Sequence, residues 1–372
     1  MGKSFKILTI SGIPLKLHWS FPIMLIYPFY VFREASLTIQ LTFAGLILGL
    51  FLCVLLHELG HAFAARRYGV MTVDIILSPI GGVARLKQLP SNPIQELVIA
   101  AAGPLVNVVI ALIIGVVLYI TQGYLDFSYF NEMGELLRYV DWINFLMLIF
   151  FLNIFLVLFN LIPAFPMDGG RIFRALLSLK LKRERATFYA MRIGQLFAIL
   201  FVVYGFMQDD YIIPIIGAFV FMAATSEYRS VKLGEVLKQY TTKDVMRDPV
   251  TALKSDTPVH LANEYLLKDN SGDFLVVGEE DNAFIGVVTR NTLNNLYKNK
   301  EGQDLAIISY ISDKVKIVSE NTNTNQLYEL MSEERLSNVV IMDEMGEVQG
   351  IIDVLQMDTF IRKHIKESRQ IF

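Results

Sequence analysis

Residues 49–70 read GLFLCVLLHELGHAFAARRYGV, an apolar run that contains three ionisable side chains in its centre. They form the pattern His57-Glu58-Leu59-Gly60-His61, with the two histidines four residues apart. Residues four apart share one face of an α-helix, so both imidazoles can bind one cation, with Glu58 beside them as a general base. Ionisable groups inside a membrane-length apolar segment are costly and usually functional. The stretch therefore predicts a metal site on a membrane helix, and zinc is the metal that imidazole and carboxylate ligands favour here.

The composition places this helix in a larger membrane domain. Hydrophobic residues make up 53% of the 372 residues, and charged residues only 19%, against about 25% in soluble chains. The long apolar runs lie in residues 1–228, whereas the remainder resembles a soluble domain in composition. We expect a multi-pass α-helical membrane protein with a C-terminal α/β domain. The net charge of −3 gives no indication of nucleic-acid binding.

A membrane-crossing helix needs about 20 apolar residues. Six segments meet this criterion: 17–33, 38–65, 94–121, 142–163, 186–207 and 211–228. Basic residues in short connections mark the cytoplasmic side. They gather in alternate connections, namely Lys3, Lys6 and Lys16; Arg66, Arg67, Arg85 and Lys87; and Arg171, Arg174, Lys180, Lys182, Arg183 and Arg185. The other connections hold Arg33 and Arg138 with Asp126, Glu132, Glu135, Asp209 and Asp210. The pattern predicts a protein of the plasma or inner membrane with both termini in the cytoplasm.

A catalytic zinc site needs a third protein ligand and an open position. The single cysteine, Cys53, cannot form an internal disulfide, and we interpret it as a small buried hydrophobic residue rather than a ligand. The candidates for the third ligand are His18, Asp74, Glu96, Asp141 and Asp168.

Asp168 differs from the other candidates because it follows a break in an apolar segment. Residues 160–171 read NLIPAFPMDGGR, in which two prolines end the helix and two glycines allow a tight turn. Irregular backbone at membrane depth persists only inside protein or beside a water-filled cavity. In the expected topology, Asp168 and the two histidines all lie near the cytoplasmic ends of their helices. Asp168 is therefore the favoured third ligand.

Four motifs together resemble the site-2 protease family of intramembrane zinc metalloproteases, in its microbial branch with C-terminal CBS domains. They are HELGH at 57–61, PIGGVA at 79–84, AGPLVN at 102–107 and NLIPAFPMDGGR at 160–171, and the resemblance covers nearly the whole chain. It implies one zinc ion per chain bound by His57, His61 and Asp168, with Glu58 as the base that acts on a zinc-activated water. It also implies that Asn160 lies near the site.

The resemblance implies hydrolysis of peptide bonds in membrane-spanning protein substrates within the lipid bilayer. Asn160 then bonds the substrate or the developing oxyanion, or else it is a helix-packing amide. Asn107 is expected to be structural. The segment Val73 to Lys87 reads as two short strands around Gly81-Gly82. It can form an edge that pairs with an unwound substrate or a re-entrant loop that fills the bundle, and we favour a mixture of the two.

The C-terminal part contains two similar units, at 240–300 and 301–366, after a linker at 229–239. Each reads as a strand, a helix and paired strands that end in Gly286-Val-Val or Gly350-Ile-Ile, and the pair resembles tandem CBS domains, whose usual ligands are adenine nucleotides. The family pattern places Ser or Thr after this strand and an acid three positions later. The first unit keeps Thr289 but has Thr292 at the later position, and the second unit has Asp353 and Gln356. Nucleotide sensing and a purely gating or dimerising role, including a homodimer through the CBS units, both remain open.

Two other functions fit parts of the pattern. A CBS-regulated divalent-metal transporter would also bury a His, Glu and Asp cluster, but the spans show no inverted repeat, and transport does not need the base that Glu58 supplies. An inactive relative that only binds substrates is disfavoured by the complete set of His57, Glu58, His61 and Asp168.

Overall fold

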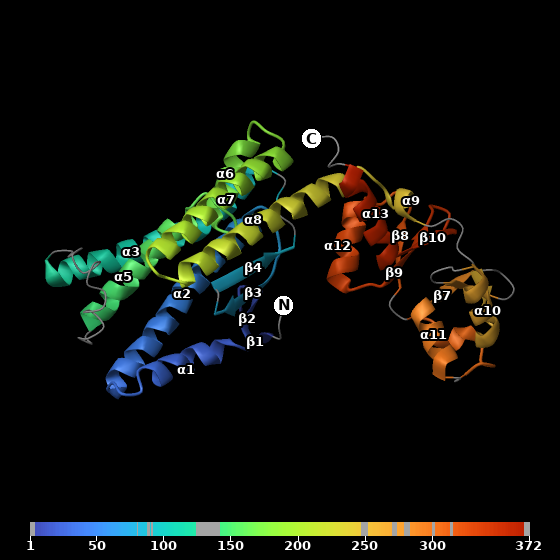
Figure 1. The fold of residues 1–372 in the computed structure, drawn as a ribbon, viewed down its shortest axis with the longest axis horizontal. Helices are drawn as coiled ribbons and strands as arrows, with labels where there is room; N and C mark the ends of the chain where they lie inside the picture. Colours follow the sequence, from blue (N-terminus) through green and yellow to red (C-terminus); the bar gives the residue numbers. More distant parts are fainter. Residues whose placement is uncertain are drawn as a thin grey trace. The chain divides into compact units, whose positions relative to one another are not determined.

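The computed structural model describes residues 4–79, 81–87, 90, 92–123, 142–246, 252–269, 274–278, 283–299, 302–312 and 315–367. The chain divides into two compact units, Met1–Arg229 and Ser230–Phe372 (Figure 1). Several residues used above to predict orientation or ligands lie outside the described residues: Lys3, Asp126, Glu132, Glu135, Arg138 and Asp141.

Five helices in the described part of the chain are long and apolar enough to cross a membrane. They are α2 (Leu37–Arg67), α3 (Pro93–Gln122), α5 (Trp142–Asn160), α7 (Arg183–Met207) and α8 (Ile212–Leu237). The shortest, α5, has 19 residues, which is about 28 Å at 1.5 Å per residue, close to the thickness of a hydrocarbon core of about 30 Å. These helices match the second to sixth spans predicted from the sequence.

The first predicted span, 17–33, differs from the structure. Its beginning forms the end of strand β2 (Ile13–His18), and only α1 (Phe21–Val31) is helical. Eleven residues extend about 16 Å, too short to cross a bilayer. Strand β1 (Ser4–Ile10) pairs with β2 around Ser11 and Gly12, both of which have positive φ. The N-terminal segment is therefore a hairpin followed by a short apolar helix.

The two N-terminal strands belong to a four-stranded sheet in the order β1-β2-β3-β4. Strands β3 (Thr72–Ser78) and β4 (Gly81–Leu86) form the hairpin predicted from the sequence and are antiparallel, whereas β2 and β3 are parallel. Strand β4 is consequently an edge of the sheet. Both β3 and β4 contact α2, so the sheet lies against the helix that carries the histidines.

A buried carboxylate holds the central strands together. Asp74 on β3 is fully buried, bonds Arg85 on β4 through two side-chain nitrogens, and lies 2.6 Å from Lys16 Nζ on β2. The hydrogen bond from Arg85, helped by Lys16, holds the pKa of Asp74 below its usual value against the effect of desolvation. Asp74 therefore acts as a structural anion.

The break predicted at the end of the fourth span, 142–163, is confirmed. Helix α5 ends at Asn160, and α6 (Asp168–Ser178) begins at Asp168 after a segment with a cis Phe165-Pro166 bond. A Cβ on Gly169 would lie 2.3 Å from the Ile162 carbonyl oxygen. Only glycine allows this approach, so the start of α6 lies directly on the backbone that leaves α5.

A group of charged residues joins α6 to two long helices. Arg174 on α6 is fully buried and lies 2.5 Å from Glu96 on α3 and 2.6 Å from Glu227 on α8. Arg183, at the start of α7, lies 3.4 Å from the second Glu96 oxygen. We call these four residues the Arg174 cluster. Since a buried charge is stable only when paired, the cluster fixes α6 against α3 and α8.

The second unit contains two copies of one arrangement, as the sequence predicts. The first has β5 (Ala252–Lys254), α10 (Val259–Asp269), β6 (Phe274–Val277), β7 (Phe284–Val288) and α11 (Arg290–Asn299). The second has β8 (Lys316–Ser319), α12 (Thr324–Glu334), β9 (Asn338–Met342), β10 (Val348–Asp353) and α13 (Val354–Glu367). Each sheet combines one parallel and one antiparallel pair. The two sheets share a small apolar core of Leu275, Val287, Val340 and Ile351.

Candidate metal centre and CBS cleft

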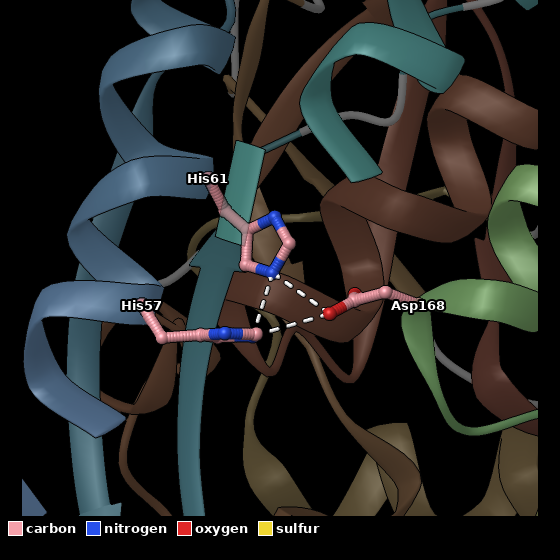
Figure 2. A group of neighbouring side chains, drawn as sticks. All are labelled: His57, His61 and Asp168. Carbon is pink, nitrogen blue, oxygen red and sulfur yellow. Dashed lines mark hydrogen bonds and ion pairs between the residues drawn. The ribbon is translucent and has the colours of Figure 1, made fainter. Parts of the chain in front are cut away.

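Three buried side chains from distant parts of the sequence converge on one point. His57 and His61 lie one turn apart on α2, and Asp168 is the first residue of α6. The Nε2 atoms of the histidines are 3.1 Å apart, and each is 3.1 Å from Asp168 Oδ2 (Figure 2). Asp168 also benefits from its place at a helix N-terminus, where the backbone dipoles favour an anion.

The hydrogen bonds behind the imidazoles indicate that this group suits a cation. His61 Nδ1 lies 2.7 Å from the Ile99 carbonyl oxygen, and because a carbonyl can only accept, Nδ1 carries the proton. A neutral imidazole then has a lone pair on Nε2, which points at the Asp168 carboxylate and the other imidazole. Three acceptors that face one another repel unless a cation lies among them. Two imidazole nitrogens and one carboxylate oxygen are the ligand set of catalytic zinc sites.

Close helix packing makes room for the three side chains. A Cβ on Gly103 of α3 would lie 2.2 Å from His61 Nε2 and 2.8 Å from His57 Nε2. A Cβ on Gly60 of α2 would lie 2.8 Å from the Ala102 carbonyl oxygen. Gly60 requires glycine because the α3 backbone approaches α2 there, and Gly103 because the two imidazole rings occupy the space beside it. The motif at 102–107 thus shapes the space into which both imidazoles point.

Glu58 lies between the histidines in sequence and faces the sheet. Its Oε2 accepts a hydrogen bond of 2.8 Å from the Ala84 backbone N–H on β4. A Cβ on Gly82 would lie 2.8 Å from Glu58 Cγ, so glycine is needed where the strand crosses the helix. The outer edge of β4 therefore lies against the carboxylate.

The other candidates for the third ligand bond elsewhere. His18 bonds Ser20, Asp74 bonds Arg85 and Lys16, and Glu96 bonds Arg174 and Arg183. Among the described residues, His57, His61 and Asp168 are the group whose ligand atoms could hold a metal ion. Asn160 is the half-buried last residue of α5.

Two buried amides stand behind His57. The Asn107 side chain on α3 lies 2.6 Å from His57 Nδ1, and it bonds Asn153 on α5 at 2.9 Å. Both amides are fully buried. From the sequence, Asn107 is expected to be structural, and Asn153 was missed. The signal for Asn153 is an amide in the middle of a 19-residue helix whose other polar residues, Asn144 and Asn160, lie near its ends; polar side chains within such helices usually have a specific partner.

The second unit contains a separate cleft. It has a volume of about 1000 Å³ and is lined by both repeats, with polar groups that include Thr289, Arg290, Arg335, Asp353 and Asp358. Thr289, which fits the nucleotide pattern, and Asp353, which departs from it, both cap helices. Thr289 Oγ1 accepts from the Thr292 N–H at 3.1 Å, and Asp353 Oδ1 accepts from the Gln356 N–H at 2.6 Å. The Gln356 side chain donates to the Val245 carbonyl at 2.5 Å. The departures from the signature are therefore used within the fold.

Comparisons with known proteins agree with this architecture. A model of peptidase family M50 matches residues 45–201, and a CBS domain model matches residues 243–298 and 307–357. The chain is 33% identical over 352 residues to a zinc metalloprotease of Methanocaldococcus jannaschii, with 95% of this chain and 94% of that protein covered. It is 27% identical over 316 residues to a putative zinc metalloprotease of Synechocystis, covering 82% and 79%.

Among solved structures, the site-2 protease from Methanocaldococcus jannaschii is similar, with 36% sequence identity and a TM-score of 0.44. The match covers 61% of this chain and 95% of that one. The fold and the sequence similarity define a membrane metalloprotease with tandem CBS domains. The chain belongs to peptidase family M50 and is of the site-2 protease type.

Proposed function

We propose that the protein is an intramembrane zinc endopeptidase that hydrolyses peptide bonds of membrane-spanning substrates, using Glu58 as its general base. The observation that carries this proposal is the convergence of His57 Nε2, His61 Nε2 and Asp168 Oδ2 within 3.1 Å of one another. Both histidines lie on α2, a helix able to cross a membrane. Glu58 follows directly in the same helix.

In this proposal, His57, His61 and Asp168 hold one zinc ion, which supplies Lewis-acid activation of water and of the scissile carbonyl. Glu58 takes a proton from the attacking water and delivers it to the leaving nitrogen. The bond from the Ala84 N–H orients the Glu58 carboxylate before the reaction. Asn160 bonds the substrate or stabilises the developing oxyanion. This role is supported by its place directly before Leu161, whose carbonyl oxygen lies 2.4 Å from the position of a Cβ on Gly169, the residue after Asp168.

The substrate class follows from the position of β4. A helical peptide bond is shielded by its own hydrogen bonds, so the substrate segment must unwind before hydrolysis. An extended segment needs partners for its backbone, and an exposed sheet edge supplies them. Strand β4 is such an edge and lies beside Glu58, which favours the edge interpretation of this hairpin over the plug.

We further propose a multi-pass protein of the plasma or inner membrane with both termini in the cytoplasm, as the alternation of basic connections predicts. Five full crossings alone would put the termini on opposite sides. Strand β2, however, pairs with β3 directly after the C-terminal end of α2, which supports an N-terminal hairpin at that same, cytoplasmic end. The proposed boundaries are 1–228 for the protease, 229–239 for the linker, and 240–300 and 301–366 for the CBS units. The CBS pair regulates the protease or dimerises it. Adenine nucleotides are the first ligands to test in its cleft, since this cleft is lined by polar groups of both repeats.

Two substitutions test the proposed division of roles. Glu58→Gln should abolish cleavage and retain zinc, because the amide cannot take a proton but leaves all three ligands in place. Asp168→Ala should lose both. The assay compares new protein termini, identified by mass spectrometry, in membranes of cells that express each variant, and zinc is measured per purified chain.

The same measurements also distinguish the proposed protease function from a divalent-metal transporter function. New termini inside predicted spans that depend on Glu58 support proteolysis. Zinc-dependent cation flux in vesicles that survives Glu58→Gln, without new termini, would favour the divalent-metal transporter. Full zinc occupancy and full activity in Asp168→Ala would remove that residue from the site.

A further inference from the structure

The two histidines of the metal centre are held by different kinds of acceptor. His61 Nδ1 faces the Ile99 backbone carbonyl at 2.7 Å, a group that can only accept a hydrogen bond. His57 Nδ1 faces a side-chain amide, that of Asn107, at 2.6 Å. An amide can present either its oxygen or its NH₂ group. The protonation of His57 therefore depends on which way the Asn107 amide is turned.

A second amide determines that orientation. Asn153 Nδ2 donates to the Ile149 carbonyl oxygen at 2.8 Å and to Cys53 Sγ at 3.3 Å. Because the carbonyl cannot donate, the NH₂ group of Asn153 must face it, and Asn153 Oδ1 must face Asn107. Asn107 Nδ2 donates to that oxygen at 2.9 Å. Its own Oδ1 is thereby turned toward His57.

The orientation of the Asn107 amide determines whether His57 Nε2, the atom that faces the proposed metal position, carries a proton. When Asn107 Oδ1 accepts from His57 Nδ1, the proton of the neutral imidazole lies on Nδ1, and Nε2 keeps its lone pair. If Asn107 were reversed, its NH₂ group would donate to Nδ1, and the proton would move to Nε2, which lies 3.1 Å from Asp168 Oδ2. A protonated Nε2 cannot bind a metal. Both amides are fully buried, so solvent does not offer an alternative partner.

We propose that Asn153 is a positioning residue of the metal centre, which acts through Asn107 to keep His57 in its metal-binding tautomer. The inference rests on the proposed zinc site. The hydrogen bonds connect the Ile149 carbonyl to Asn153 on α5, Asn153 to Asn107 on α3, and Asn107 to His57 on α2. Because the first acceptor is a backbone carbonyl, the fold determines the orientation of both amides. Asn153 touches neither the metal ligands nor the substrate in this role.

A purely structural role for Asn153 makes a different prediction. If Asn153 only held α3 and α5 together, its removal would have the same effect with either Asn or Asp at position 107. An amide that orients Asn107 becomes unnecessary when residue 107 needs no orientation. Asn107→Asp creates that situation, because a carboxylate presents an oxygen whichever way it turns, and a carboxylate is a common partner of metal-binding histidines.

The experiment measures the zinc dissociation constant of the full chain in detergent, by competition with a chromophoric chelator at fixed pH. Four proteins are compared: the intact chain, Asn153→Leu, Asn107→Asp and the double variant Asn107→Asp/Asn153→Leu. We expect Asn153→Leu to weaken zinc binding by about 10- to 100-fold, the usual effect of losing an outer-shell partner. In the Asn107→Asp background, residue 107 has no N–H to donate to Asn153 Oδ1, so the same substitution removes a contact between two acceptors. There it should not raise the dissociation constant by more than about threefold.

An equal loss in both backgrounds, or no loss in either, would overturn the proposal. If the intact chain did not bind zinc, the proposed metal site itself would be wrong. The measurement on the intact chain alone decides this. Asn153→Ala, made in the same two backgrounds, replaces Asn153→Leu if the larger side chain prevents folding. Melting temperatures are recorded for every variant, so that a loss of packing is separated from a loss of zinc affinity.

Discussion

Gly103→Ala tests the geometry of the metal centre with the smallest possible change. The new Cβ would lie 2.2 Å from His61 Nε2, 2.5 Å from His61 Cε1 and 2.8 Å from His57 Nε2. Ordinary contacts between such atoms begin at about 3.5 Å, so the His61 ring must retreat by about 1.3 Å. A retreat of this size also strains its 2.7 Å contact with the Ile99 carbonyl.

The displacement exceeds what a zinc site tolerates. Zinc–nitrogen bonds are about 2.0–2.1 Å long, and a competent site keeps its distances within about 0.2 Å. A shift several times larger removes one of three ligands. We therefore expect zinc affinity to fall by more than about 100-fold, beyond the range seen for outer-shell changes, and cleavage to be lost with it.

The fold should survive the substitution, because alanine stabilises a helix interior by about 1 kcal/mol relative to glycine. The control is Gly45→Ala on α2, where the new Cβ would meet Phe145 at an ordinary 3.5 Å. Zinc per chain and melting temperature are measured on both purified variants. Gly103→Ala protein with full zinc content would refute the assignment of this space to the metal centre.

Two further predictions concern residues near the site. Asp74→Asn should lower the free energy of unfolding at pH 7 by about 2 kcal/mol, since charge-assisted hydrogen bonds from Arg85 and Lys16 are lost. Because the hydrogen bond from Arg85 holds the pKa of Asp74 in the folded state below the ordinary value of an aspartate, the ionised group stabilises the fold above that ordinary value. This contribution is lost as the pH falls through the folded pKa. Melting curves from pH 7 to pH 3 should thus show a shallower acid loss in Asp74→Asn, and identical slopes would contradict the assignment. Cys53→Ala should leave the zinc dissociation constant unchanged, because the Ile149 carbonyl still orients Asn153; weaker zinc binding would show that the thiol takes part.

Local spacing was enough to predict the three side chains that the structure brings together. His57 and His61 follow from helical periodicity, and Asp168 follows from a proline-broken segment. The contacts behind them could not be predicted, because hydrogen-bond direction depends on which helices become neighbours. Asn107 and Asn153 are 46 residues apart, and no pattern within either helix indicates that they meet or which way each amide turns.

The N-terminal segment shows a different limit. Hydropathy alone suggested a membrane span at 17–33, whereas residues 4–18 form two strands and only 11 residues of α1 are helical. Burial of Ile13 and Leu15 against α2 decides this outcome, together with the parallel pairing of β2 with β3. Such pairing joins segments separated by two helices, so the apolar content of one segment does not reveal it.

The Arg174 cluster limits the motions open to the membrane unit. If α6 moved away from α3, Arg174 would separate from Glu96. Their side chains are 0% and 4% exposed, respectively, and breaking such a buried pair costs about 3–5 kcal/mol. Fewer than about one molecule in a hundred would be open in this way at any moment, since 1.4 kcal/mol corresponds to a tenfold change in population. Asp168 therefore moves as one rigid body with α3, and a substrate must gain access by displacing other elements while the spacing of carboxylate and imidazoles is kept.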